Sequence, residues 1–259
     1  MTIIAFNRYW VVRWPWVLFN LLVLALLLGL SFWQWQRAAE KTQTLARIAD
    51  WKMQGAVDIN HLLTINTNNR DGLQLAFNGR WLAPMVWLID NQMVNGRIGY
   101  DVLIAVEDVS APKNSAALLV NLGWIAAPLE RSVLPVVNVP QELRVQGTFR
   151  TRTKGVLLGT NIENKGVWPM RIQQVDTEIL ATQFNLPLIN GLVYQEKSIP
   201  QEEKSLQGNN TFFLTHYRPV ILPPERHKAY ALQWLLLAVA VVVIALAASA
   251  RKKIHGVES

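Results

Sequence analysis

Two long uncharged runs, one near each end, constrain this chain more than any other feature. Residues 14–36 form a run of 23 positions without a charged side chain, and residues 229–250 form another of 22 positions. Leu, Val, Ala and aromatic side chains dominate both runs. A helix rises about 1.5 Å per residue, so roughly 20 apolar residues cross the hydrocarbon of a bilayer. The sequence therefore predicts a membrane protein with two terminal transmembrane helices, at 14–36 and 229–250.

The first run also resembles a signal peptide, because Arg8 and Arg13 precede it and Gly29 and Ser31 are small residues. It is longer than the apolar core of a normal signal peptide, however, and it ends in SFWQWQR in place of a small-residue cleavage site. An uncleaved anchor is the better interpretation, and cleavage is the alternative.

Basic residues in the short tails set the expected orientation. The two tails together contain five cations: Arg8, Arg13, Arg251, Lys252 and Lys253. The positive-inside bias predicts that the tails 1–13 and 251–259 are cytoplasmic and that residues 37–228 lie on the other side of the membrane. No long Arg/Ser-rich transit peptide precedes the first run, which favours a bacterial inner membrane, with a periplasmic central domain, over a mitochondrial membrane.

The charge of the chain gives no indication of nucleic-acid binding. The formal net charge is +7, but residues 37–228 carry 20 basic and 17 acidic side chains, so much of the excess belongs to the tails. The chain has no cysteine, which excludes disulfides and thiolate chemistry.

The central segment predicts one β-rich domain, of α+β class with a mainly antiparallel sheet. ELRVQGTFR alternates strictly, with Leu143, Val145, Gly147 and Phe149 on one face. MVWLID and GYDVLIAVED are strand-like and are separated by Asn95-Gly96, a strong turn signal. AALLVNLGWI predicts a further strand that ends at Gly123-Trp124, and Asn78-Gly79 and Asn190-Gly191 predict further turns.

One short helix is expected at DTEILATQF. Asp176 suits its N-cap, Glu178 suits the positive end of the helix dipole, and Leu180 with Phe184 forms an i,i+4 apolar pair. The polar segment 200–210 is expected to be a mobile loop.

The sequence carries no recognisable catalytic motif. It contains no GxSxG, P-loop or GxGxxG pattern, and its acidic residues are dispersed. The four histidines, His61, His216, His227 and His255, lack HxH or HxxxH spacing. These features favour a protein that is not an enzyme.

Unusual residues gather where the two runs meet the central domain. The first run ends in FWQWQR, which contains Trp35, Gln36 and Arg37, and the second begins in RHKAYALQW. Such aromatic and basic residues are typical of a belt at the membrane surface. His227, Tyr230 and Trp234 also share a helical face, and the antiparallel first helix can bring Trp35 and Arg37 against them. A neutral imidazole beside aromatic side chains and edged by arginines suits a haem with acidic propionates, so the belt and a haem site remain alternatives.

Three stretches, in order along the chain, resemble the Surfeit locus protein family: LGLSFWQWQRAAEK, LLVNLGW and HKAYALQW. The resemblance implies an assembly factor for haem–copper cytochrome c oxidase that binds haem a and supplies it to the oxidase core subunit, with haem a synthase a further candidate partner. It implies His227 as the haem-iron ligand. The family's other motif residues correspond to Gly123, Trp124, Trp35, Gln36 and Arg37, and Gln233 belongs to the third stretch.

Two positions depart from the family pattern. Leu122 stands where the family usually has arginine, and Arg226 stands where it often has asparagine. Whether His227 holds haem separates two hypotheses: a membrane-bound haem chaperone, and a cofactor-free scaffold that binds an oxidase subunit through its periplasmic domain.

Overall fold

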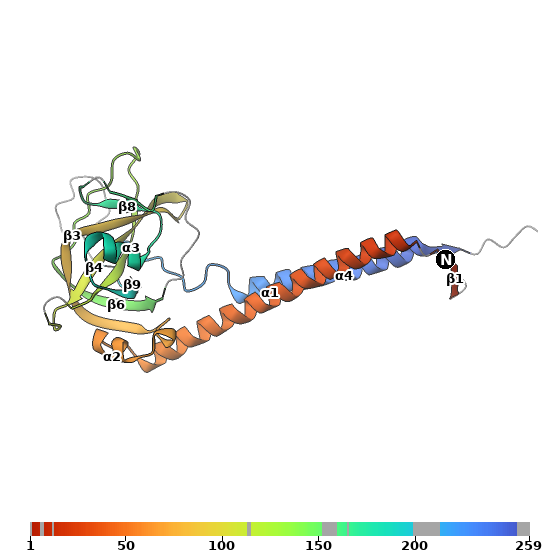
Figure 1. Ribbon diagram of the computed structural model, residues 1–259, viewed down its shortest axis with the longest axis horizontal. Helices are drawn as coiled ribbons and strands as arrows, with labels where there is room; N and C mark the ends of the chain where they lie inside the picture. The colour runs from red at the N-terminus through yellow and green to blue at the C-terminus, as the bar shows by residue number, and fades with distance from the viewer. Residues whose placement is uncertain are drawn as a thin grey trace, which may run out of the picture. The chain divides into compact units, whose positions relative to one another are not determined.

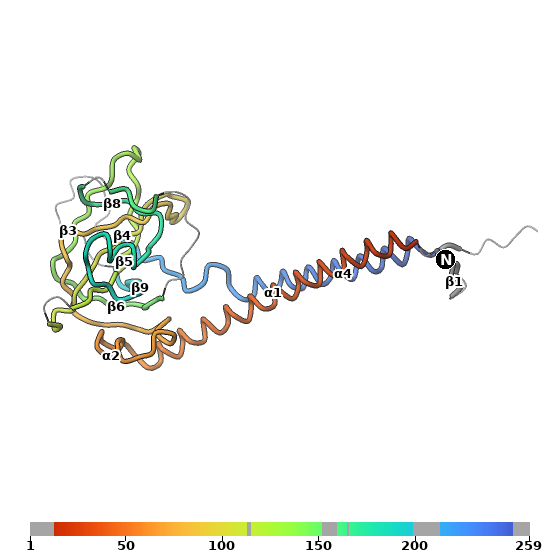
Figure 2. The backbone as a smooth tube through the Cα atoms, in the orientation of Figure 1, coloured from red at the N-terminus to blue at the C-terminus, as the bar shows by residue number. Residues whose placement is uncertain are grey.

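The computed structural model divides the chain into two compact units, which Figures 1 and 2 show as ribbon and tube. One unit combines Met1–Leu45 with Pro219–Ser259, and the other is Ala46–Arg218. The structure describes residues 2–5, 8–11, 13–112, 115–151, 160–164, 166–198 and 213–252, with the backbone alone at 2–5, 8–11 and 251–252. The predicted loop at 200–210 lies outside the described residues.

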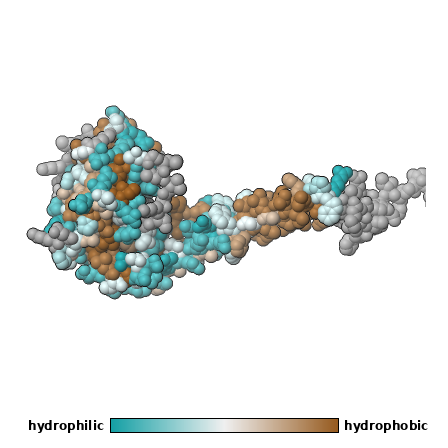
Figure 3. Space-filling model, in the orientation of Figure 1, coloured by the Kyte–Doolittle hydropathy of each residue, from teal (hydrophilic) through white to brown (hydrophobic). Residues whose placement is uncertain are grey.

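Two long apolar helices form most of the first unit. They are α1 (Trp14–Gln54) and α4 (Pro224–Ser249), drawn red to orange and blue in Figure 1. Both are long and apolar enough to cross a membrane, and only 6% and 11% of their most apolar windows are buried, unlike the core helix of a soluble protein. Their outward side chains give the helix pair its apolar surface in Figure 3. The predicted pair of terminal apolar helices is therefore present.

The local sequence explains why α1 extends beyond the apolar run and why α4 begins where it does. In α1 the helix runs beyond residue 36 because strong helix formers such as Ala, Glu, Lys and Gln follow the apolar run. In α4, Pro224 occupies the first helical position, where its missing N–H costs nothing and its fixed φ favours the helix.

The helices pack antiparallel along a narrow seam. On α4 the less exposed side chains recur at alternating spacings of three and four: Pro224, His227, Ala231, Trp234, Ala238, Val241 and Ala245. On α1 the same spacing connects Val17, Asn20, Leu24, Leu27, Ser31, Gln34 and Ala38. A mean spacing of 3.5 residues keeps one face turned toward the partner helix, as in a left-handed coiled coil.

The two tails pair with each other at one end of this helix pair. Strands β1 (Thr2–Ala5), β2 (Arg8–Val11) and β10 (Ala250–Lys252) form an antiparallel sheet in the order β1-β2-β10. The segment before α1 and the segment after α4 therefore lie on the same side of the helix pair.

The second unit is built on a closed barrel of five strands. These are β3 (Gln74–Val94), β4 (Arg97–Asp108), β5 (Ala117–Ala126), β6 (Glu142–Arg150) and β9 (Leu188–Gln195). They pair in the order β4-β5-β9-β6-β3, and β3 pairs with β4 to close the ring. The β5–β9 pair is parallel, so the barrel is mixed and not purely antiparallel.

Short elements surround the barrel. Strand β8 (Met170–Ile172) runs parallel to the second half of β3, and β7 (Ile162–Glu163) pairs with β8. The remaining elements are α2 (Ile59–Thr64), the 3-10 turn η1 (Thr67–Asn69) and α3 (Thr177–Phe184).

Two apolar clusters share the barrel strands. One includes Phe77, Val102, Val120 and Phe149, with Leu62 of α2 against it. The other includes Trp87, Leu103, Leu119, Ile172 and Leu180 of α3. Successive residues of a strand point to opposite faces, so β4 and β5 contribute to both clusters and are buried along nearly their whole length.

Several local predictions are confirmed. Asp176 caps α3 by accepting hydrogen bonds from the backbone N–H groups of Glu178 and Ile179. β6 buries the predicted face, and Thr148 on its other face is buried too. Asn95 and Gly96, both with positive φ, join β3 to β4 as a hairpin.

Three predicted strand ends are wrong. Asn78-Gly79 lies inside β3, where Gly79 pairs with both Leu143 and Asp108, and Asn190-Gly191 lies inside β9. Strand β5 does not end at Gly123-Trp124 but continues to Ala126. The glycines there permit close approach by neighbouring chain segments, a second use of the residue that turn propensities do not distinguish.

Candidate functional site

His227 lies in the seam of the helix pair, in the first turns of α4. Its residue surface is 8% exposed, whereas its neighbours Arg226 and Lys228 are exposed. The imidazole Nδ1 lies 2.7 Å from the side-chain Oε1 of Gln34 on α1. An amide oxygen only accepts hydrogen bonds, so Nδ1 donates in this contact, and in a neutral imidazole the lone pair is then on Nε2.

A second polar contact sets the register of the helices beside His227. The hydroxyl of Ser31 donates to the carbonyl oxygen of Ala231 at 2.8 Å. Ala38 and Ala231 are almost completely buried, and their small side chains allow the helices to approach closely. The contacts Ser31–Ala231 and Gln34–His227 follow one another in antiparallel order, one helical turn apart.

The predicted site residues occupy different parts of this unit. Trp234 shares the seam with His227, but Tyr230 is 38% and Trp35 is 60% exposed on the flanks. Gln36 and Gln233 are exposed. The structure therefore brings His227 and Trp234 onto one stripe with Gln34 opposite, and leaves Tyr230 and Trp35 on the outer surface of the helices.

Arg37 is exposed and engaged with its own helix. Its guanidinium forms a 2.7 Å ion pair with Glu40 and lies 5.8 Å from the ring centroid of Trp33. An exposed i,i+3 ion pair contributes little, so an acidic ligand group could replace Glu40 at small cost.

Gln34 is the residue of this site that sequence reasoning missed. Gln34, Gln36 and Gln233 carry the same side chain, so residue type alone does not distinguish Gln34 from the other two. Gln34 could have been identified from its position on α1, because it continues the alternating spacing of three and four residues between Ser31 and Ala38. That spacing puts Gln34 on the face toward α4, whereas Gln36 points elsewhere.

These side chains suit a haem better than a metal ion bound by protein alone. An imidazole with one nitrogen held by a neighbour and the other carrying a lone pair is the usual form of a ligating histidine. Trp35 and Tyr230 offer exposed aromatic surface on the same two helices, and Arg37 and Arg226 offer charge for propionates. The residues present therefore fit a haem with His227 Nε2 toward the iron.

Gly123 and Trp124, the second predicted motif, lie inside the barrel unit. Gly123 is buried with φ +128°, and the backbone of Trp124 exchanges two hydrogen bonds with Leu214, at 2.8 and 3.0 Å. The indole N–H of Trp124 donates to the carbonyl oxygen of Gln92. Trp124 is only 4% exposed, so in this structure the motif joins three chain segments and has little surface for a partner.

Residues 213–217, which we call the strap, cross the barrel at this motif. Phe213 is fully buried and Leu214 bonds to Trp124, as described. Tyr217 accepts a hydrogen bond from Arg150, which also pairs with Asp71, and the Tyr217 ring stacks on Tyr194. The strap is therefore attached at several points along its length.

His216 provides the strap's polar attachment. Its Nε2 lies 2.6 Å from Oδ1 of the buried Asp101, whose Oδ2 accepts from the amide of Asn121. Asn121 in turn accepts from the backbone N–H of Gly123. The hydrogen bond to Asp101 raises the pKa of His216 above its usual value, against opposing effects of burial and of Arg218.

Leu122, where the family usually has arginine, is fully buried in the barrel core. A leucine there adds to core packing, and an unpaired arginine would be costly. The position at which this chain departs from the family pattern therefore lies inside the barrel unit and not on its outer surface.

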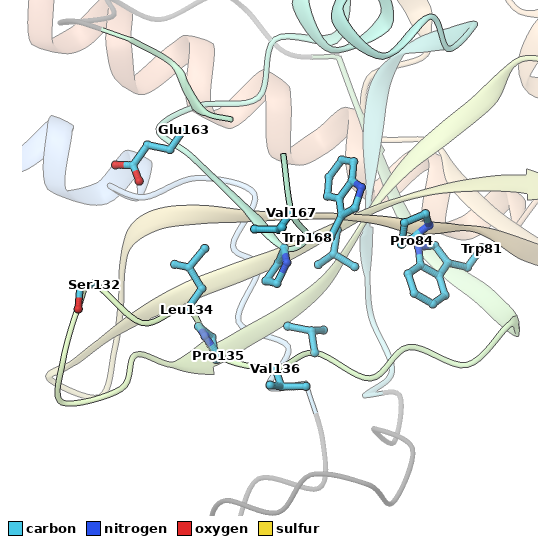
Figure 4. Close-up of a pocket in the computed structure, with 12 residues that line it drawn as sticks. Trp81, Pro84, Ser132, Leu134, Pro135, Val136, Glu163, Val167 and Trp168 are labelled. Carbon is cyan, nitrogen blue, oxygen red and sulfur yellow. The ribbon is translucent and has the colours of Figure 1, made fainter. Parts of the chain in front are cut away.

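The barrel unit also has an apolar groove of about 460 Å³. Figure 4 shows Trp81 and Pro84 of β3 at one end, Ser132 and Glu163 at the other, and Trp168 between them. Val136 and Val167 on its rim are 73% and 64% exposed. Exposed apolar side chains around a hollow are typical of an interaction site, and no sequence pattern indicated this one.

Comparison with curated proteins finds no match. The model of the SURF1 family matches residues 21–239, which include most of α1, the first part of α4, the barrel unit, and the His227 and Gly123-Trp124 motifs. The chain therefore belongs to the SURF1 family, whose members are linked to cytochrome oxidase assembly and are assembly factors rather than enzymes.

Proposed function

We propose that this protein is a membrane-anchored assembly factor that binds haem a beside its helix pair and delivers it to the core subunit of cytochrome c oxidase. Helices α1 and α4 cross the bacterial inner membrane, both tails are cytoplasmic, and the barrel unit is periplasmic. The basic residues of the tails and the pairing of β2 with β10 on one side of the helix pair support this orientation.

The burial of His227 in the helix seam is the observation that carries the haem proposal. A histidine of an interfacial belt faces the lipid headgroups. The His227 side chain instead lies in the helix seam and is hydrogen-bonded to Gln34 on the other helix. A buried, hydrogen-bonded imidazole near flat aromatic surface is a suitable axial ligand.

The proposed roles follow from the positions of the side chains. His227 would hold the iron, Tyr230, Trp234 and Trp35 would contact the ring, and Arg37 would meet a propionate in place of Glu40. When bound, the haem supplies the redox-active iron that the oxidase requires. The protein keeps the ring at the membrane boundary until the oxidase core subunit takes it, with haem a synthase a candidate donor.

The groove of the barrel unit favours a second function, a scaffold without cofactor. A hollow with an exposed apolar rim suits an oxidase subunit as partner, and it does not depend on His227. Both functions agree with the family's link to oxidase assembly.

One spectrum distinguishes the two functions. The full-length protein is purified in detergent from cells that make haem a, and its Soret absorption is recorded together with the oxidase subunits that co-purify. A Soret band that His227→Ala abolishes supports the haem chaperone. A retained subunit complex with no Soret band in the wild type would replace it with the scaffold.

A further inference from the structure

We infer that Gln34 is the positioning residue of the haem site, setting which nitrogen of His227 is offered to the iron. The inference rests on the proposed function, because it assigns a role within the same site. Its physical basis is one contact between two helices: Oε1 of Gln34 and Nδ1 of His227, 2.7 Å apart. Nothing in the sequence motifs distinguishes Gln34 from its neighbours.

The contact determines the tautomer of His227. A neutral imidazole has one protonated and one unprotonated nitrogen, and the hydrogen bond at one nitrogen decides the state of the other. With an amide oxygen at Nδ1, the proton stays there and the lone pair points from Nε2. Among the described residues no hydrogen-bonding partner contacts Nε2, so this nitrogen is free to bind iron.

The same contact restricts rotation of the ring. His227 belongs to α4 and Gln34 to α1, so the ring orientation depends on the register of the two helices. Ser31 holds that register independently through the carbonyl oxygen of Ala231. A change at Ser31 therefore removes one register contact and leaves the acceptor in place, whereas a change at Gln34 removes the acceptor and leaves the Ser31 contact.

A role in helix register alone explains the contact between Gln34 and His227 less well than a role in positioning the imidazole. A polar residue in an apolar helix seam often only specifies register. Ser31 already supplies a register contact one turn away, and the acceptor of Gln34 is directed at the one ionisable side chain that the described seam contains. A role in register alone would not require an acceptor atom at Nδ1.

Three substitutions separate the acceptor from the shape of the side chain and from register. Gln34→Met keeps the length and removes the acceptor, and Gln34→Glu keeps an acceptor oxygen. Ser31→Ala weakens the register contact alone. Gln36→Met, the same change two residues along on an exposed position, is the matched control.

The first measurement needs no haem. Nitrogen NMR of cofactor-free, full-length protein labelled with ¹⁵N-histidine in detergent reports the protonation of each ring nitrogen, and His227→Ala assigns the signals. At alkaline pH, where a carboxylate beside the ring no longer keeps both nitrogens protonated, we expect protonated Nδ1 and unprotonated Nε2 in the wild type, Gln34→Glu and Gln36→Met, and loss of this preference in Gln34→Met. A wild-type spectrum with unprotonated Nδ1 would mean that the amide donates to the ring, and would overturn the inference.

The second measurement is a spectroscopic titration of the same proteins with haem a. Loss of the partner of a ligating histidine typically weakens metal binding roughly 10- to 100-fold, which we expect for Gln34→Met. Gln34→Glu, Ser31→Ala and Gln36→Met should bind like the wild type. Equal binding by Gln34→Met and wild type, or equal weakening by Ser31→Ala and Gln34→Met, would overturn the positioning role. A wild type that binds no haem a would instead end the proposed function.

Discussion

Gly123 lies directly against the backbone of Leu214, so closely that a Cβ atom at position 123 would be 2.7 Å from the carbonyl oxygen of Leu214. The φ angle of Gly123, +128°, is one that residues with side chains rarely adopt. The strap therefore crosses β5 at Gly123, because glycine permits both this backbone conformation and the close contact.

Gly123→Ala should destabilise the barrel unit for both reasons. Backbone strain in a sparsely populated region costs of order 1–3 kcal/mol, and displacement of the strap adds to it. Gly96→Ala is the control, since Gly96 also has positive φ but open space around it. Denaturant unfolding of the full-length protein in detergent, followed by tryptophan fluorescence, measures the difference. If Gly123→Ala were no more destabilising than Gly96→Ala, the contact with Leu214 would have no energetic role.

Gly123→Glu should be more severe, because it also buries a charged group at a cost of several kcal/mol. We expect low steady-state levels and rapid proteolysis of the barrel unit. Normal abundance with normal protease resistance would contradict the close packing of the strap on β5.

Attachment of the strap should weaken as the pH rises. Asp101 raises the pKa of His216 above 6.5, so protonated His216 is favoured in the folded state. The stability from this pair is complete below pH 6.5 and is lost as the pH rises through the folded-state pKa. Hydrogen exchange at the amides of Leu214 and Trp124 should therefore be better protected at acid than at alkaline pH, after correction for the intrinsic pH dependence of exchange.

His216→Gln is the matched variant for that pH dependence. It keeps a hydrogen-bond donor toward Asp101 but does not titrate. In this variant, protection of the Leu214 and Trp124 amides from hydrogen exchange should not change with pH over the same range. A pH dependence equal to that of the wild type would assign the effect to another group.

His227→Ala should insert and accumulate normally while losing haem. Alanine is a good helix former, and Arg226 and Lys228 remain to anchor the start of α4. The Soret band of protein purified from haem a-producing cells should disappear or shift, and His227→Met, which offers a thioether, should retain some haem with an altered spectrum.

His61→Ala is the control for His227→Ala, since His61 is exposed on α2 of the barrel unit. His255 lies outside the described residues, in the predicted cytoplasmic tail, and its replacement should be silent. An unchanged haem spectrum in His227→Ala would end the ligand assignment, and loss of haem in His216→Ala alone would move the site to the strap.

Reporter fusions should place both tails on the cytoplasmic side. A reporter that is active only in the periplasm should function when inserted within residues 200–210 and fail when fused at Ser259. The pairing of β2 with β10 predicts the same failure for a fusion at the N-terminus. Activity at either terminus would contradict the orientation.

The sequence by itself determined the features that depend on neighbouring residues. Length and apolar composition alone identify α1 and α4 as helices that could cross a bilayer, because that criterion depends only on a long uncharged segment. Asp176 at the start of α3 and Asn95-Gly96 between β3 and β4 were predicted correctly because capping and hairpin turns are local interactions. His227 was singled out by its position at the start of the second run, although its role as a ligand stays a prediction.

Only the tertiary structure decided which distant residues meet. The sequence predicts turns at Gly79 and Gly191, yet the barrel places them within strands, because β3 pairs with both β4 and β6 and β9 pairs with both β5 and β6. Gly123 was predicted to end a strand, whereas it lies within β5 and packs against a strap that comes from far along the chain. Gln34 faces His227 only because the antiparallel packing of two helices fixes their register, and register depends on side-chain fit along the whole seam and on no local pattern.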